Sequence, residues 1–185
     1  MKLPKNSKKV FTGKIFDIYQ WKQKMYDGSY KIFECSQRKA VVDIIAIINN
    51  KIIILEQKQP TKPLFPSLPG GGIEKNETAL QAAKRELLEE TGCIAKKIIK
   101  LEHFTGTAKM LFPETVFIAR DCTKMDKQNL DSGEKIKLTL KSFDEFLQLC
   151  RHERFTAPIG LKFMMYEALL DKKKYNSLKN SVFGE

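Results

Sequence analysis

The residues GGIEKNETALQAAKRELLEETGC, from Gly71 to Cys93, carry most of the information in this sequence. A glycine-rich turn comes first, and the residues after it lack proline and predict a helix over about residues 78–90. Asn76 is a candidate N-cap, and Gly92 lies just past the expected end of the helix. We therefore expect a tight turn that leads directly into a helix.

Three carboxylates fall on one side of this expected helix. Glu89 and Glu90 follow Glu86 by three and four positions, so the three side chains occupy a single arc. Like charges at this spacing destabilise a helix by roughly 0.2–0.5 kcal/mol per pair. A hard cation such as Mg²⁺ or Mn²⁺, which prefers carboxylate oxygens, would relieve that repulsion. Taken alone, these residues also fit an ordinary solvated helix end.

The fixed positions of the whole segment resemble the Nudix box. Read in order, they are Gly71, Glu77, Arg85-Glu86, Leu87, Glu89-Glu90 and Gly92, at the spacing of that motif. The resemblance implies an enzyme that hydrolyses the pyrophosphate bond of a nucleoside diphosphate linked to another moiety. It also implies Mg²⁺ (or Mn²⁺) as the cofactor.

The resemblance further implies roles for individual residues. The implied metal ligands are Glu86, Glu89, Glu90, Glu134 and the carbonyl of Gly70. The candidate catalytic groups are Glu89, Glu134 and Glu114, with Asp131 as a further candidate for the general base. The residues with an implied structural role are Gly71, Glu77, Arg85 and Gly92. Arg85 offers a planar fork of donors that is well suited to bind Glu77 and hold the loop on the helix.

Outside the box, residues 10–170 resemble more loosely the ADP-ribose and nucleotide-sugar branch of the family. The segments Gln57-Lys58-Gln59-Pro60 and Gly133-Glu134-Lys135-Ile136 carry this part of the resemblance. The implied substrate is ADP-ribose or a nucleotide sugar, cleaved to a nucleoside monophosphate and a sugar phosphate. Two alternatives stay open: a housecleaning nucleoside triphosphate or RNA-end pyrophosphatase, and a non-catalytic nucleotide-binding module with the same fold.

Four residues outside the box are candidate substrate contacts: Trp21, Arg38, Gln59 and Lys109. Trp21 could stack on a purine or pack within the N-terminal strands. Arg38 could contact a phosphate or be simple surface charge. Gln59 stands where the ADP-ribose branch frequently has an arginine, and Lys109 could compensate for it.

The hydrophobic pattern mixes strands with helices. Alternating residues from Val10 to Cys35 predict a β-hairpin or meander, Val41–Ile48 predicts a buried strand, and the prolines of residues 59–69 predict a loop. The family resemblance implies an α/β fold, an α/β/α sandwich with a central mixed β-sheet and an N-terminal β-rich arm. We expect the arm over residues 1–38, the Nudix hydrolase domain over residues 39–175 and a C-terminal tail over residues 176–185.

The composition narrows the partners and the compartment. The chain has 33 Lys and Arg against 22 Asp and Glu, and the resulting net charge of +11 attracts anions such as nucleotides. The lysines are spread along the whole chain, however, so nucleic acid is not the expected partner. No apolar run is long enough to cross a membrane. The cysteines are scattered singly, which favours a cytoplasmic setting. The expected partner is a small-molecule nucleoside diphosphate derivative, and the apolar residues of the arm suggest a homodimer.

Overall fold

The computed structural model describes residues 2–107, 109–130 and 132–184, which divide into two compact units. The arm unit contains the chain up to Ala40 together with His103–Glu114. The core unit contains Val41–Glu102 and the chain from Thr115 onward. Strands β8 (Cys93–Thr107) and β9 (Met110–Lys124) each contribute residues to both units.

The arm unit is a small antiparallel sheet. Its strands are β1 (Lys8–Thr12), β2 (Phe16–Lys24) and β3 (Tyr30–Arg38), with β2 paired to both neighbours. The turn between β2 and β3 is closed by Asp27, whose side chain accepts hydrogen bonds from the backbone N–H and hydroxyl of Ser29 at 2.9 and 2.7 Å. The end of β3 pairs in parallel with the beginning of β9.

The core unit contains the larger part of the mixed sheet. Strand β4 (Val41–Ile48) pairs with β5 (Lys51–Gln59) and with the short strand β7 (Gly70–Gly72). Strand β5 also pairs antiparallel with β6 (Lys62–Ser67) and β10 (Lys135–Lys141), and β8 pairs with β9. The strands of the core unit therefore surround β4 and β5, which are its most deeply buried strands.

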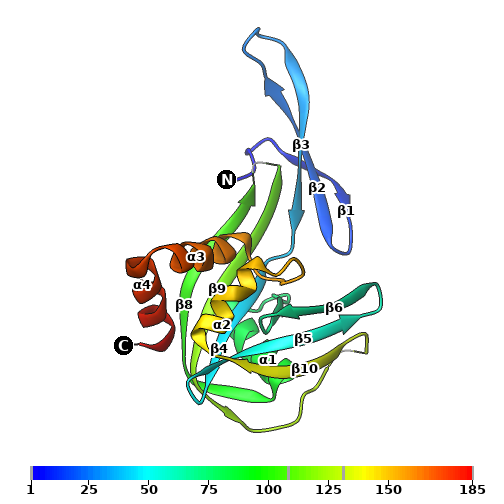
Figure 1. Ribbon diagram of the computed structural model, residues 1–185. Helices are drawn as coiled ribbons and strands as arrows, with labels where there is room; N and C mark the ends of the chain where they lie inside the picture. The colour runs from blue at the N-terminus through cyan, green and yellow to red at the C-terminus, as the bar shows by residue number, and fades with distance from the viewer. Residues whose placement is uncertain (1, 108, 131, 185) are drawn as a thin grey trace. The chain divides into compact units, whose positions relative to one another are not determined.

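Helices cover this sheet (Figure 1). Helix α1 (Ala79–Thr91) buries Ala82, Ala83 and Leu87 against alternate residues of β4 and β5. The remaining helices are α2 (Phe143–Gln148), followed by the 3₁₀ turn η1 (Leu149–Arg151), then α3 (Ile159–Leu170) and α4 (Lys172–Phe183). The α/β fold predicted from the sequence, a mixed sheet with flanking helices and an N-terminal β-rich arm, is confirmed.

Two local predictions were wrong. Residues 59–69 are not all loop, because Lys62–Ser67 form strand β6 despite Pro63 and Pro66. Proline is tolerated there because β5 is the one described strand that pairs with β6, and on its other side β6 has only an isolated bridge from Ser67 to Thr156. A missing N–H therefore breaks no central ladder. The second is the N-cap of α1, which is Thr78 rather than Asn76. Apart from these, residues 176–183 of the segment expected as a C-terminal tail form part of helix α4.

Candidate active site

Helix α1 is fixed at both ends by its own sequence. Thr78 and Gln81 form a capping box, in which the Thr78 hydroxyl accepts from the Gln81 N–H and the Gln81 side chain accepts from the Thr78 N–H. Gly92 ends the helix with φ of 68°, and its N–H donates to the Leu88 carbonyl. A residue with a Cβ is strained in that left-handed conformation, which explains the glycine.

Strand β7 brings backbone close to the charged side of α1. Gly71 pairs with Val42 of β4, and a Cβ at Gly71 would collide with the carboxylate of Glu86. A Cβ at Gly70 would collide with the carbonyl of Val42. In contrast, a Cβ at Gly72 would meet nothing within 4 Å. Close approach to the β4 backbone therefore requires glycine at position 70, whereas a Cβ at position 71 would displace the Glu86 carboxylate.

Arg85 ties this turn to the helix. Its Nε and Nη2 donate to the two carboxylate oxygens of Glu77 at 3.0 and 3.1 Å, and Nη2 also donates to the Gly72 carbonyl at 2.9 Å. Its Nη1 donates to Glu86 at 2.8 Å and to Glu89 at 3.0 Å. Hydrogen bonds from Arg85 and from the Glu74 N–H lower the pKa of Glu77. The contact predicted between Arg85 and Glu77 is present, and Arg85 in addition holds two carboxylates of the arc.

Glu90 is the most buried carboxylate of the helix. Its side chain accepts a 2.7 Å hydrogen bond from the Gly70 N–H, and only 4% of the residue is exposed. Burial raises the pKa of Glu90 to about 8; the Gly70 bond opposes the shift, and the charges of Glu86, Glu134 and Asp43 add to it. Burial also raises the pKa of Glu86, although Arg85 opposes it. Several carboxylates thus converge where there is little water to stabilise them.

These side chains line one cavity of about 260 Å³, which we call the acidic cavity. It is lined by Gly70, Gly71, Gly72, Glu74, Arg85, Glu86, Glu89, Glu90, Asn129 and Glu134. The segment that carries Asn129 is held to the end of α1, because the Asn129 N–H donates to the Glu89 carbonyl at 2.8 Å and Gln128 donates to the Glu90 carbonyl at 2.6 Å. The structure therefore brings together the five residues implied as metal ligands, Gly70, Glu86, Glu89, Glu90 and Glu134, in one cavity.

The donor set of the acidic cavity fits a hard divalent cation. The side-chain oxygens that line it belong to glutamate carboxylates and the Asn129 amide. The mutual repulsion and desolvation of the carboxylates are the conditions that a cation would relieve. Within residues 2–107, 109–130 and 132–184, no three Asp, Glu, His or Cys side chains are already arranged as a ligand set. Glu86 and Glu89 each direct an oxygen to Arg85, so binding would require these oxygens to turn.

The other candidates lie elsewhere. Gln59 lines a second cavity of the core unit, described below, that also includes Glu134. Trp21, Arg38, Lys109 and Glu114 belong to the arm unit. Asp131 lies outside the described residues.

Within the arm unit, these side chains have defined surroundings. Trp21 is buried with Cys35 and Leu111, and its indole N–H donates to Gln23 at 3.1 Å. The Arg38 guanidinium lies 4.4 Å from the centre of the Phe112 ring. Burial raises the pKa of Glu114, and the charge of Arg38 opposes that shift. The Lys109 carbonyl accepts a hydrogen bond from the Ser36 N–H at 3.0 Å.

Asp43 and Asn129 lie near the acidic cavity but were not identified as site residues from the sequence. Asp43 raises the pKa of Glu90 from strand β4, where it faces Gly70 across the ladder. The sequence did contain an indication that Asp43 has a role, because this charged residue interrupts the otherwise apolar run Val41–Ile48. No sequence pattern indicated Asn129, because its position beside the acidic cavity follows from backbone hydrogen bonds to the end of α1.

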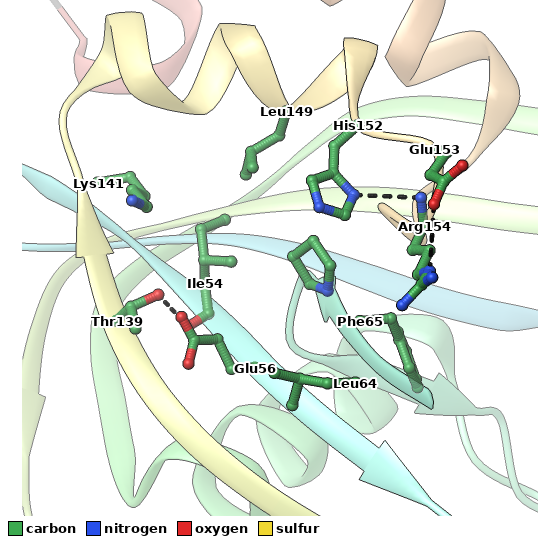
Figure 2. A pocket seen from close by; sticks show the side chains of 11 residues that line it. Ile54, Glu56, Leu64, Phe65, Thr139, Lys141, Leu149, His152, Glu153 and Arg154 are labelled. Atoms are coloured by element: carbon green, nitrogen blue, oxygen red, sulfur yellow. Dashed lines mark hydrogen bonds and ion pairs between the residues drawn. The ribbon is translucent and has the colours of Figure 1, made fainter. Parts of the chain in front are cut away.

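A larger cavity of about 500 Å³ lies on the other face of β5 (Figure 2). Ile53 and Leu55 pack in the cluster that contains α1, so the alternate residues Ile54 and Glu56, which line this cavity, point away from α1. His152 also lines it, and its Nδ1 accepts from the Arg154 N–H at 3.1 Å. This cavity contains none of the predicted site residues and is separate from the acidic cavity.

Comparison with known proteins establishes the class. The family model described as the NUDIX domain matches residues 37–160, and the chain belongs to this family. It is a Nudix hydrolase.

Individual relatives are also similar over most of the chain. The ADP-ribose pyrophosphatase of Bacillus subtilis (strain 168) is 30% identical over 146 residues, 76% of this chain and 78% of that protein. The methanol dehydrogenase activator of Bacillus methanolicus is 28% identical over 175 residues, 90% of this chain and 94% of that protein. A crystal structure of an ADP compounds hydrolase superposes with a TM-score of 0.71 at 18% identity, covering 92% of this chain and 95% of the other, which supports the fold.

Proposed function

We propose that the protein hydrolyses the pyrophosphate bond of ADP-ribose or a closely related ADP compound, with Mg²⁺ as cofactor, to give a nucleoside monophosphate and a sugar phosphate. The observation that carries this proposal is the acidic cavity, where Glu86, Glu89, Glu90 and Glu134 surround the glycine turn. The substrate is supported by the similarity to the Bacillus subtilis enzyme, which is named for ADP-ribose.

The residues proposed to hold the metal are Glu86, Glu89, Glu90, Glu134 and the Gly70 carbonyl. When bound, the divalent ion supplies positive charge that neutralises the diphosphate and lowers the pKa of a coordinated water. Glu90 is held in place by the Gly70 N–H, so its direction is set before any ligand arrives. Arg85 holds Glu86 and Glu89 from one nitrogen and limits how far these side chains can move.

Glu89 and Glu134 are the groups proposed to orient the attacking water and accept its proton. Both line the acidic cavity, but they come from different segments, the helix and the residues just before β10. Glu114 and Asp131 are the remaining candidates, and the raised pKa of Glu114 would suit a base. Comparing the variants E89Q, E134Q and E114Q separates them. The base is the residue whose loss lowers kcat while metal affinity stays near that of the wild type.

The substrate proposal is tested by product analysis. The enzyme would be incubated with Mg²⁺ or Mn²⁺ and a panel of ADP-ribose, nucleotide sugars, dinucleoside polyphosphates, NADH, nucleoside triphosphates and 5′-capped RNA. We expect the highest kcat/KM for ADP-ribose or another ADP compound. Faster cleavage of triphosphates or capped RNA would replace this proposal with the housecleaning or RNA-end alternative. Tight binding of nucleotides without cleavage of any compound would favour the non-catalytic module.

Self-association through the arm is part of the proposal. Several large apolar side chains of the arm are exposed, among them Phe11 at 59%, Tyr30 at 65% and Ile32 at 61%. Such a surface is typical of an interface. Size-exclusion chromatography with light scattering should show a homodimer, and the double variant F11S/I32S should shift it toward the monomer. A wild-type protein of 21.3 kDa mass in solution would contradict this.

A further inference from the structure

A second cavity of the core unit lies directly beside the reaction site. It has a volume of about 300 Å³, and its lining residues are Lys58, Gln59, Pro60, Lys62, Ser132, Gly133, Glu134 and Lys135. We call it the lysine cavity. Glu134 is a lining residue of both this cavity and the acidic cavity, so the two cavities are neighbours at that residue.

The strand register sets two of its lysines against each other. Lys58 of β5 lies directly opposite Lys135 of β10 in the antiparallel ladder, and both side chains are exposed. Like charges directly opposite destabilise a sheet, because the side chains of such a pair stand side by side on one face. Two residues along the same ladder, Lys137 lies opposite Glu56, which is the favourable combination. The unfavourable pair thus occurs only at the end of the ladder that borders Glu134.

A third cation adds to this pair. Lys62 is another lining residue of the lysine cavity, and its ammonium lies 5.2 Å from the centre of the Phe65 ring. No ion pair found among the described residues involves Lys58, Lys62 or Lys135. Three lysines therefore line a cavity whose one described carboxylate, Glu134, also lines the acidic cavity. This charge suits a ligand with more than one negative charge.

We propose that the lysine cavity binds a phosphate monoester carried by the part of the substrate beyond its diphosphate. This inference rests on the proposed function and narrows it: the preferred substrate is a nucleoside diphosphate joined to a phosphorylated sugar. A neutral sugar would leave the repulsion between Lys58 and Lys135 in place, whereas a dianionic phosphate between them removes it. Lysine ammonium groups suit this role because they act as compact point charges with rotatable donors. Gln59 can add a neutral hydrogen bond to the same group.

The expected size of the preference for the phosphorylated compound follows from the exposure of the lysine side chains to solvent. An exposed pair of opposite charges changes an affinity by about two- to fivefold, so three lysines together give a preference of roughly tenfold or more. The contribution should fall as salt screens it. A general attraction by the net charge of +11 would also favour a more anionic substrate, but it would not depend on which lysine is removed.

The experiment compares ADP-ribose with ADP-ribose that carries a phosphate monoester on the distal ribose. kcat/KM is measured for both compounds with the wild type and with the variants K58Q, K135Q and K137Q, at low and high salt. We expect the wild type to prefer the phosphorylated compound by about tenfold, and K58Q and K135Q each to lower that preference by about two- to fivefold. K137Q is the matched control, because Lys137 lies on the same face of the same strand but opposite Glu56, and it should retain the preference.

The outcomes separate this inference from the proposed function. Hydrolysis of ADP-ribose with no preference for the phosphorylated compound overturns the inference and leaves the proposed function intact. An equal loss of preference in K137Q and K135Q also overturns it, because general charge would then be the cause. If neither compound is hydrolysed, the proposed function fails, and calorimetric titration of both compounds without divalent metal decides the inference. Tighter binding of the phosphorylated compound, lost in K58Q and K135Q, supports it, and equal binding overturns it.

Discussion

The acidic cavity and the lysine cavity share Glu134 but are opposite in charge and in construction. The acidic cavity depends on a helix, where residues three and four positions apart in the sequence lie together. The lysine cavity depends on the pairing of β5 with β10, which brings together residues far apart in the chain. The difference indicates that the chemistry of the enzyme is encoded locally, while the specificity that we propose depends on the assembled sheet.

The largest effect should come from removing one charge from the acidic cavity. E90Q keeps the shape of the side chain, and we expect kcat to fall about 10³-fold or more, because a proposed metal ligand is lost. The fold should survive, since Glu90 is buried and its raised pKa already reflects the cost of charge there. Steady-state kinetics and circular dichroism measure the two quantities. A near-normal rate would show that Glu90 is not a metal ligand and that the acidic cavity is not the site of reaction.

A smaller loss should follow from closing the acidic cavity sterically. In G71A the added Cβ would collide with the Glu86 carboxylate and push it out of position. We expect kcat/KM to fall by about 10–100-fold, as for disturbed ligand orientation, with weaker binding of Mn²⁺. G72A is the matched control, because its Cβ would meet nothing within 4 Å. Equal losses in the two variants would show that the strand, rather than Glu86, is disturbed.

Stability should respond to Arg85 more than to any lysine near it. R85K replaces the planar fork that binds Glu77 with a single ammonium group, and the bonds to Gly72 and Glu86 cannot all be kept. The free energy of unfolding should fall by about 1–3 kcal/mol, measured by urea denaturation without divalent metal. K84Q, at the exposed neighbouring position, should change it by less than about 0.5 kcal/mol. If R85K is as stable as K84Q, the turn is not held by Arg85.

The smallest expected effect is a change in stability that differs in sign between two nearby pairs of the β5–β10 ladder, Lys135–Lys58 and Lys137–Glu56. K135Q removes one partner of the repulsive pair with Lys58 and should raise the free energy of unfolding by about 0.2–0.5 kcal/mol at low salt. K137Q removes the partner of Glu56 and should lower it by a similar amount. Both changes should shrink at high salt. Urea denaturation of the variants side by side measures the difference, and the same sign for both would argue against the register-based account of the lysine cavity.

The sequence predicted the part of the site that a single helix and its turn determine. The spacing of Glu86, Glu89 and Glu90 needed no tertiary information, and the partner of Arg85 followed from its donor geometry. The family resemblance likewise led to the correct fold class. The prediction of the helix N-cap was wrong because two local capping patterns were both present in the sequence. Thr78 with Gln81 matched the capping box as well as Asn76 matched a simple cap, and the box prevailed.

Long-range pairing accounts for what could not be predicted. The pairing of Lys58 with Lys135 depends on the register of β10 against β5, which no short stretch of sequence reveals. Likewise, Asn129 reaches the acidic cavity through a backbone hydrogen bond to Glu89, which is independent of its own side chain. Pro63 and Pro66 suggested a loop because the sequence does not show that β6 has a neighbouring strand, β5, along one side and only an isolated bridge along the other.

The prolines of β6 also affect how readily the protein can aggregate through the edge of its sheet. A sheet edge with an unbroken row of N–H and C=O groups can recruit a strand from another molecule and start aggregation. Pro63 and Pro66 interrupt the row of donors on β6, so an incoming strand would find a discontinuous template. The same residues that obscured this strand in the sequence therefore help to keep the folded protein from polymerising through its edge.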